Sequence, residues 1–455
     1  MSWSTHVLLV TIFLSLLSLL TINHSLVDAN QRDNLVVVTV ATQITEGFLR
    51  FNRSVNLYGL KLEVLGLSQQ WEGGDVAHRP GGGQKILLLK KYMESVKDQK
   101  DLIVLFTDSY DVVFNGGLKE ILNRFHSFES KLVFSSEKFC WPDPSLESEY
   151  PKSDGKRFLN SGAFIGYAPT VYSIVSHKNI ENDDDDQLYY TKIYLDSKLR
   201  EQHKIKLDLL SELFQNLNGA LSDVEIRFSQ ANEIDETNAD ASLLNKLYQT
   251  NPIIVHGNGN SKIPLNSLGN YLAKSWHPAT GCLSCKENRI SLDNLPVEKY
   301  PHVLIAVNIL KPTPFFDEWL QDLESMDYPK ERITLFIQTL TDYHSTQLEQ
   351  FIDDFKGYYQ AIRYKSTKDL EWQLRNRYLD ECPRIGCDYL FVWDTEGRLT
   401  NPKTLRALIE DNKSVVAPLM FRNNELWSNF WGALTHDGFY SRAHDYVQII
   451  KGERR

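Results

Sequence analysis

The feature that most constrains the fold is a set of short apolar runs, rich in Val, Ile and Leu, separated by segments with helical character. In the first part of the chain these runs are Leu35–Thr42, Leu102–Phe106, Lys131–Ser135, Ala163–Gly166, Val224–Phe228 and Pro252–Val255. Runs in which polar and apolar residues do not alternate are typical of strands buried on both faces. Their alternation with helical segments such as Gln84–Val96 predicts an α/β fold with mostly parallel sheets.

The same pattern restarts after a polar segment, 278–301, that lacks periodicity and that we interpret as a linker. The later runs are His302–Val307, Ile333–Ile337, Tyr389–Trp393 and Val415–Leu419. The order of features also repeats, because an apolar run that ends in acidic residues occurs at Leu105–Asp111 and again at Phe391–Glu396. Together with a length of 455 residues, this predicts two tandem domains of one fold.

The N-terminus has the pattern of a targeting signal. Val7–Ile22 carries no charge, and small residues around Ala29 are suited to cleavage by a signal peptidase. We therefore predict a signal peptide over residues 1–29 and entry into the secretory pathway. An uncleaved anchor is the alternative, but the apolar run is short for a stable membrane span.

The five cysteines are interpreted in that oxidising setting. Cys282 with Cys285, and Cys382 with Cys387, are close pairs that favour disulfides. The alternative, a zinc site, would require the two pairs to converge. Cys140 is left over. Asn52 and Asn412 each begin an N-glycosylation sequence, and both are expected at the surface of a glycoprotein.

Acidic residues follow a buried run where a ligand crevice is expected. Asp108 and Asp111 come directly after the run at 102–106, and the carboxyl ends of parallel strands form the crevice of open α/β sheets. Two carboxylates at one place repel each other unless a cation lies between them. His256, at the end of another apolar run, could supply a third ligand, and an Asp-Asp-His set favours Mn²⁺ over Ca²⁺. The alternative is a turn with solvated acids.

Several further residues near these runs are candidates for ligand binding. Asp183–Asp186 is an acidic cluster that either faces the crevice, lies in solvent or attracts calcium. Trp71, Tyr110 and Trp141 lie in loops where they could stack on a base or a sugar, or else pack in the core. Lys85 follows Gly81–Gly83 and could contact a phosphate at a helix start, although the loop is not a Walker A sequence. The net charge of −10 argues against a nucleic-acid partner.

Taken together, these motifs resemble one known family. Residues 34–277 are similar to the glycosyltransferase domain of the procollagen lysyl hydroxylases, and residues 302–455 resemble the accessory domain that follows it. The resemblance rests on Val38–Thr42, Phe51–Val55, Gln84–Lys85, Thr107–Val112, Phe134–Pro142, Leu159–Gly166, Asp183–Gln187 and His256–Asn258. It implies two tandem glycosyltransferase-A-like (Rossmann-like) domains, of which the second is not known as a catalytic unit.

The resemblance also implies an activity and a set of site residues. It implies a Mn²⁺-dependent, retaining enzyme that moves glucose or galactose from UDP-glucose or UDP-galactose to (galactosyl)hydroxylysine of collagen. Its partners would be collagen or procollagen chains. It would work in the endoplasmic reticulum lumen or outside the cell. It would act alone, as a homodimer or together with full-length lysyl hydroxylases. By motif position, the implied metal ligands are Asp108, Asp111 and His256. The residues that would hold UDP are Trp71, Val76, Lys85, Tyr110 and Asn258. The sugar and acceptor side would be lined by Cys140 and by the catalytic residues Glu137, Trp141, Asp185 and Asp186.

One departure from the family limits the expected activity. None of the 12 histidines is followed two residues later by Asp, so the H-x-D part of the family's iron triad is absent. We therefore expect no lysyl hydroxylase activity from this chain, and an accessory domain that is cut short. The alternative function is a non-catalytic scaffold or collagen-binding module that assists full-length lysyl hydroxylases. In the second domain, Asp394 and Glu396 lack a partner histidine in a glycine turn, and we interpret them as a vestigial site.

Overall fold

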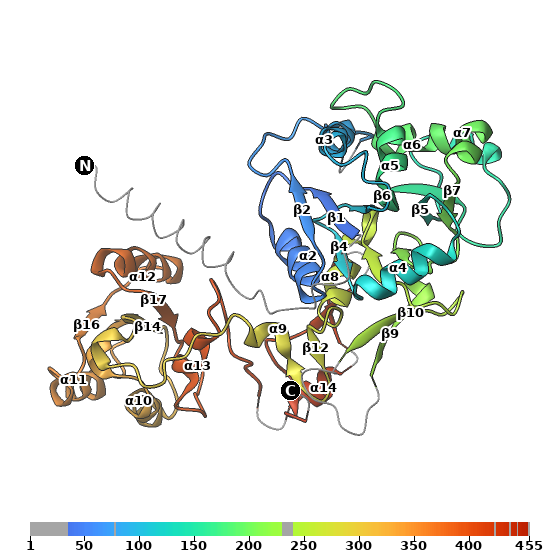
Figure 1. The fold of residues 1–455 in the computed structure, drawn as a ribbon. Coiled ribbons are helices and arrows are strands. Elements are labelled where there is room, and N and C mark those ends of the chain that lie inside the picture. The colour runs from blue at the N-terminus through green and yellow to red at the C-terminus, as the bar shows by residue number, and fades with distance from the viewer. Residues whose placement is uncertain are drawn as a thin grey trace, which may run out of the picture. The chain divides into compact units, whose positions relative to one another are not determined.

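The computed structural model describes residues 35–76, 79–229, 240–422, 425–435, 438–443 and 445–453. The predicted signal peptide lies outside these residues. The chain forms two compact units, the first made of residues up to Asp223 and Asn245–Gly259, the second of Val224–Leu244 and Asn260 onward. Figure 1 shows the elements of both units. The predicted domain limits at 34–277, 278–301 and 302–455 remain predictions.

The first unit is built on a six-stranded sheet of order β2-β1-β3-β6-β5-β7. Strands β2, β1 and β3 are parallel to one another, β6 runs antiparallel to both of its neighbours, and β5 and β7 are parallel. This confirms the predicted α/β fold with mostly parallel strands. The strands are β1 Leu35–Val40, β2 Leu62–Leu65, β3 Ile103–Thr107, β5 Leu132–Glu137, β6 Phe158–Tyr167 and β7 Ile205–Asp208.

Helices cover both faces of this sheet, with α3, α5 and α6 on one side and α2 and α4 on the other (Figure 1). Strand β1 shows why its sequence lacks polar alternation: Val36 and Val38 pack in the first core, whereas Leu35 and Val37 pack in the second. The helices are α2 Glu46–Leu57, α3 Gly83–Glu94, α4 Leu118–Ser127, α5 Ala168–Val175, α6 Asp186–Leu195 and α7 Ser197–Gln202.

A second, three-stranded sheet of order β4-β11-β8 carries part of the candidate site. It consists of β4 Val112–Phe114, β11 Ile254–His256 and β8 Phe214–Asn216. Strand β11 is antiparallel to β4 and parallel to β8, with the histidine at the end of β11 opposite both Val112 and Asn216. The predicted strand at 252–255 therefore exists, but it belongs to this smaller sheet.

The second unit contains a four-stranded parallel sheet of order β16-β15-β14-β17. One face packs against α10, α11 and α13, and the other faces α12 through Tyr378. The elements are β14 Val303–Ile309, α10 Phe316–Ser325, β15 Ile333–Thr339, α11 Ser345–Asp354, β16 Ala361–Ser366, α12 Glu371–Ile385, β17 Tyr389–Val392 and α13 Thr404–Glu410.

The prediction of a strand at 415–419 is wrong. The segment has no regular structure, and the Val415 side chain is 93% exposed. An apolar run becomes a strand only where a neighbouring strand and a core receive it, and no strand pairs with this segment among the described residues.

The remaining elements are short, and all of them except Asn245 at the end of β10 belong to the second unit. They are the paired strands β9 Val224–Phe228 and β10 Ala241–Asn245, α8 Lys262–Gly269, the pair β12 Trp276–His277 and β13 Gly281–Cys282, α9 Leu283–Lys286, the pair β18 Gly432–Leu434 and β19 Tyr440–Arg442, and α14 Tyr446–Ile450. Within the described ranges, no helix combines the length and apolarity needed to cross a bilayer.

The cysteine pairing agrees with the prediction. Disulfides join Cys282 to Cys285 and Cys382 to Cys387, and Cys140 is a free thiol. Of the two glycosylation sequences, Asn412 is exposed as expected. Asn52 is half-buried in α2, and Ser54 of the same sequence is buried, with its hydroxyl donating to the Phe51 carbonyl.

The aromatic centre of the first core yields a stability prediction. Phe164 is buried on β6, and its ring centroid lies 5.0 Å from that of Phe106, 4.9 Å from Phe134 and 5.4 Å from Tyr190. Phe164→Ala should lower the free energy of unfolding by about 3–5 kcal/mol, because it leaves a cavity that these rings cannot close. Urea denaturation measures the loss. Leu247→Ala, at a side chain that is 60% exposed, serves as the control and should change the free energy of unfolding by less than about 0.5 kcal/mol.

Candidate active site

The loop between β3 and β4 carries Asp108 and Asp111 from the six-stranded sheet to the smaller one. Its first end is held by β6, because the Asp108 N–H donates to the Gly162 carbonyl at 2.8 Å. Its second end is held by the turn after β11, where the Gly257 N–H donates to the Asp111 carbonyl at 2.8 Å. Both acids are thus fixed by backbone contacts to strands that are distant in sequence.

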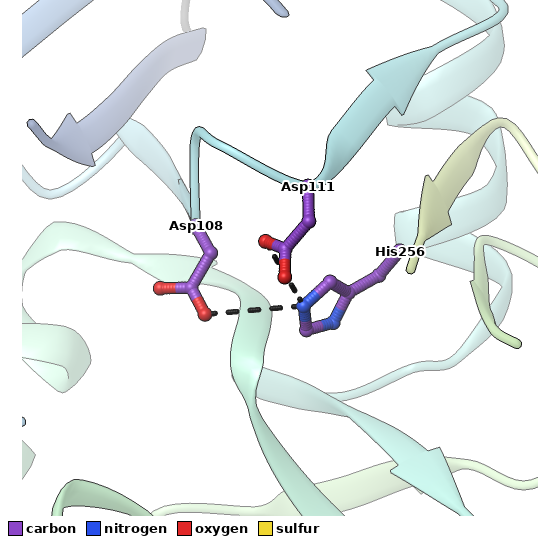
Figure 2. Close-up of side chains that lie close together, drawn as sticks. All are labelled: Asp108, Asp111 and His256. Atoms are coloured by element: carbon purple, nitrogen blue, oxygen red, sulfur yellow. Dashed lines mark ion pairs between the residues drawn. The ribbon is translucent and has the colours of Figure 1, made fainter. Parts of the chain in front are cut away.

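Asp108, Asp111 and His256 converge on one point, as Figure 2 shows. The His256 Nε2 atom lies 3.5 Å from Asp111 Oδ1 and 3.9 Å from Asp108 Oδ2. One ligand atom from each residue lies within 4.8 Å of the others. Two carboxylate oxygens and one imidazole nitrogen are a donor set that suits Mn²⁺, so these residues fit the predicted metal.

The backbone at Gly162 makes room for this cluster. A Cβ atom at this position would lie 2.2 Å from His256 Cε1, which is closer than van der Waals contact permits. A side chain on β6 would therefore displace the imidazole, and glycine is required here by close approach.

The electrostatic environment of the cluster favours a cation. Burial lowers the pKa of His256, but the charges of Asp111, Asp108 and Glu137 outweigh it, so the pKa of the imidazole is raised. Negative charge is concentrated around a buried nitrogen, as a site for a divalent ion requires.

Lys85 lies on one side of the cluster. Its Nζ atom lies 3.0 Å from Asp108 Oδ1 and 2.6 Å from Asp186 Oδ2, and the side chain is largely buried. Burial alone would lower the pKa of Lys85, yet the two carboxylates raise it above its usual value. Lys85 was predicted to contact a phosphate. The structure places it at the third residue of α3, where it links Asp108 to the acidic cluster.

The acidic cluster packs against the glycine-rich loop. The Asp185 side chain caps α6 by accepting from the Leu188 N–H at 2.6 Å, and it also accepts from the Gly81 N–H at 3.1 Å. Asp186 accepts from the Ser161 hydroxyl at 3.1 Å. The carboxylates of Asp185 and Asp186 are thus both hydrogen-bonded within the chain.

Glu137 is a buried carboxylate held by amide groups. Its Oε1 accepts from Asn160 Nδ2 at 2.8 Å and from Gln187 Nε2 at 3.0 Å, and its Oε2 accepts from Asn258 Nδ2 at 2.9 Å. Burial raises the pKa of Glu137, and the amide hydrogen bonds oppose that shift. The carboxylate therefore has a fixed position at one end of the cluster.

The aromatic and apolar candidates lie in loops around these groups. The Tyr110 hydroxyl accepts from the N–H groups of Thr42 and Gln43, and its side chain is 40% exposed. Trp141 is 49% exposed, and its carbonyl accepts from Gln187 Nε2 at 3.2 Å. Trp71 donates to the Gly74 carbonyl at 2.7 Å and packs against the first core, whereas Val76 is exposed. Tyr110 and Trp141 thus have the more exposed rings of the three aromatic candidates.

The structure also reveals site residues that were not predicted from the sequence. Three successive residues of β6 each contact a site residue: Asn160 contacts Glu137, Ser161 contacts Asp186 and Gly162 holds Asp108. These three residues belong to the Leu159–Gly166 motif, and this motif is the signal by which the sequence could have identified them. Gln187 ends the Asp183–Gln187 motif, but Asn216 has no such signal, because it is an ordinary polar residue until its partner is known.

The corresponding strand end of the second unit has a different chemistry. Arg375 lies 3.1 Å from Asp394 Oδ2, and Lys311 pairs with Glu396. Basic side chains of the same unit thus pair with both of these acids.

Comparison with protein families matches both parts of the chain. The PLOD GT domain model matches residues 31–282, which is 252 of 455 residues. The model of the glycosyltransferase family 25 N-terminal domain matches residues 370–455. The chain thus carries a glycosyltransferase domain at the place where the candidate site lies.

Individual relatives agree with this result. Procollagen-lysine,2-oxoglutarate 5-dioxygenase 1 of Gallus gallus is 46% identical over 430 residues, which cover 94% of this chain and 58% of that protein. The multifunctional procollagen lysine hydroxylase and glycosyltransferase LH3 of Rattus norvegicus is 44% identical over 426 residues, covering 93% of this chain and 56% of that protein. The chain therefore spans less than three fifths of the length of these relatives.

Among solved structures, the galactosyltransferase LgtC in complex with donor and acceptor sugar analogs is 11% identical, covering 52% of this chain and 96% of that one, with a TM-score of 0.27. The family assignment rests on the sequence matches and not on this structural similarity. Since the PLOD GT domain model accounts for more than half of its residues, the chain belongs to the procollagen lysyl hydroxylase/glycosyltransferase family.

Proposed function

We propose that the protein is a Mn²⁺-dependent, retaining glycosyltransferase that moves glucose, or galactose, from a UDP-sugar to (galactosyl)hydroxylysine of collagen. The observation that carries this proposal is the convergence of Asp108, Asp111 and His256 within 4.8 Å, inside the PLOD GT domain match. Similarity to a protein named a lysine hydroxylase and glycosyltransferase supports the acceptor class. The disulfides are consistent with work in the oxidising lumen of the endoplasmic reticulum.

In this proposal, one group of site residues binds the metal and the nucleotide, and a second group faces the sugar and the acceptor. Asp108, Asp111 and His256 would hold Mn²⁺, which when bound supplies positive charge to a leaving diphosphate. Tyr110 and Trp71 would stack on the nucleotide, next to Val76, and Asn258 would border it. Glu137 and Asp186 would face the sugar, where a fixed carboxylate stabilises positive charge that develops at the anomeric carbon. Asp185 holds the loop that carries Asp186, and exposed Trp141 would lie on the acceptor side.

Turnover of the donor alone tests the enzymatic part of the proposal. UDP-glucose and UDP-galactose are incubated with the protein, with Mn²⁺ or with excess EDTA, and UDP release is measured. We expect release with Mn²⁺ and a loss of at least about 10²-fold on chelation, since removal of a metal that stabilises the leaving group costs several kcal/mol. Equal rates with and without metal would refute Mn²⁺ dependence.

Transfer to an acceptor tests the substrate class. A collagen-like peptide with galactosyl-hydroxylysine is compared with the same peptide that carries unmodified lysine, and the product is read by mass. A gain of one hexose on the first peptide alone is the expected result. If neither donor is turned over but the protein binds the peptide, the scaffold alternative is supported instead. Size measurement in the same buffer tells whether the chain acts alone or as a homodimer.

A further inference from the structure

Behind the metal-site histidine lies a buried asparagine with a fixed amide group. Asn216 ends β8 and lies opposite His256 in the parallel pairing of β8 with β11. Its Oδ1 atom is 2.9 Å from His256 Nδ1, and its Nδ2 atom donates to the Ser136 carbonyl at 2.9 Å. Both side chains are buried, so that water does not replace these contacts.

The second contact determines which way the amide points. A backbone carbonyl only accepts hydrogen bonds, so the group that faces Ser136 must be the NH₂ of Asn216. The oxygen of the amide then necessarily faces His256. Because that oxygen only accepts, the Nδ1 atom of His256 must carry a proton and donate it.

The tautomer of the imidazole follows from this arrangement. A neutral histidine that carries its proton on Nδ1 has a lone pair on Nε2. Nε2 is the atom that lies 3.5 Å from Asp111 and 3.9 Å from Asp108. In the neutral form of His256, the lone pair therefore points at the place where the two carboxylates converge.

We propose that Asn216 is a positioning residue for the metal site: it fixes His256 in the Nδ1–H tautomer and so presents Nε2 to a divalent cation. The inference rests on the metal site of the proposed function and adds a residue outside the three ligands. Hydrogen bonds of this kind orient metal-ligating histidines and raise their basicity, and their loss typically lowers metal affinity by about 10–100-fold.

The chain holds Asn216 from a second direction, which makes the arrangement rigid. The buried Lys156 donates from Nζ to the Asn216 carbonyl at 3.3 Å. The pairing of β8 with β11 and the contact from Lys156 hold the main chain of Asn216, and the Ser136 carbonyl holds its amide. Such fixation is what keeps a ligand in place before the metal arrives.

Direct measurement of Mn²⁺ binding tests the proposal without reference to catalysis. Free Mn²⁺ is followed by its electron paramagnetic resonance signal during titration of the apo protein. Asn216→Leu keeps the branched shape of the side chain but removes the acceptor, and we expect its Mn²⁺ affinity to be about 10–100-fold lower. Asn216→Asp keeps an oxygen opposite Nδ1 and should bind Mn²⁺ nearly as tightly as the parent chain. The Mn²⁺ concentration that half-activates UDP-sugar hydrolysis should shift in parallel.

Asn245→Leu is the matched control. Asn245 is also buried in the first unit, and its amide donates to Gln215 Oε1 at 2.8 Å. This variant should lose stability while its Mn²⁺ affinity stays that of the parent. If Asn216→Leu does not fold, Asn216→Ala replaces it with the same expected loss of affinity.

The outcomes separate this inference from the proposed function. If the parent chain binds Mn²⁺ and Asn216→Leu or Asn216→Ala binds it equally well, the role of Asn216 is refuted while the metal site stands. If Asn216→Asp and Asn216→Leu lose affinity to the same extent, the residue matters only for packing and the tautomer argument fails. If the parent chain binds no Mn²⁺, the metal-dependent function itself is refuted, and the role of Asn216 with it.

Discussion

Asp111→Asn should lower Mn²⁺-dependent release of UDP from a UDP-sugar by about 10²–10³-fold, the size of effect seen when one group that stabilises a transition state is removed. The substitution keeps the shape of the side chain but removes its charge from the cluster with Asp108 and His256. A neutral amide is a weaker ligand for a divalent ion than a carboxylate. The Mn²⁺ affinity should therefore fall together with the rate, and both are measured on the same protein.

The structure offers a matched control for this experiment. Asp394→Asn removes a strand-end carboxylate from the second unit, where Arg375 pairs with it at 3.1 Å. We expect its Mn²⁺ affinity and UDP release to equal those of the parent chain. Burial lowers the pKa of Arg50, and the charge of Asp111 opposes that shift. Since Asp111→Asn removes this charge from beside a buried arginine, circular dichroism should confirm that the variant is folded. Turnover at the parental rate in folded Asp111→Asn would exclude Asp111 as a metal ligand.

Lys85→Met should destabilise the first unit by about 3–5 kcal/mol, the usual cost of removing one partner from a buried ion pair. Lys85 lies between Asp108 and Asp186, and Asp186 is buried. Without the ammonium group, two carboxylates remain close together with less compensation. The loss should appear as a lower midpoint in urea denaturation in the presence of EDTA.

A double-mutant cycle distinguishes this charge effect from lost packing. Lys85→Met combined with Asp186→Asn removes both charges of the shorter contact. The double variant should be more stable than the sum of the single effects predicts, by at least about 1 kcal/mol. Strict additivity would mean that the destabilisation comes from the side-chain stem of Lys85 and not from its charge.

Much of the fold was predictable because burial leaves a local pattern. Strand β1 and strand β14 have no polar alternation, and both are buried along their whole length. The repeated order of runs also gave the two α/β units. The prediction at 415–419 failed because an apolar run does not reveal whether a partner strand is available, and Val415 is exposed.

The candidate site was predictable in part for the same reason. Asp108 follows a strand that the sequence makes unmistakable, so its place at a carboxyl end required no knowledge of the fold. The roles of Lys85 and Asp185 were less accessible. Lys85 pairs with Asp186 and Asp108, and Asp185 caps α6, contacts that join segments far apart in the chain.

The sequence by itself determined the class of fold, the family and the chemical types of the residues at the strand ends, since hydrophobic pattern and motif are properties of neighbouring residues. Only the tertiary structure decided how those residues meet. The register of β8, β11 and β4 places Asn216 opposite His256, and His256 next to the residue that follows Asp111. A shift of one residue would turn these side chains to the other face of the sheet. Register is set by hydrogen bonds between distant strands, and for that reason the orientation of the metal-site histidine is a product of the fold.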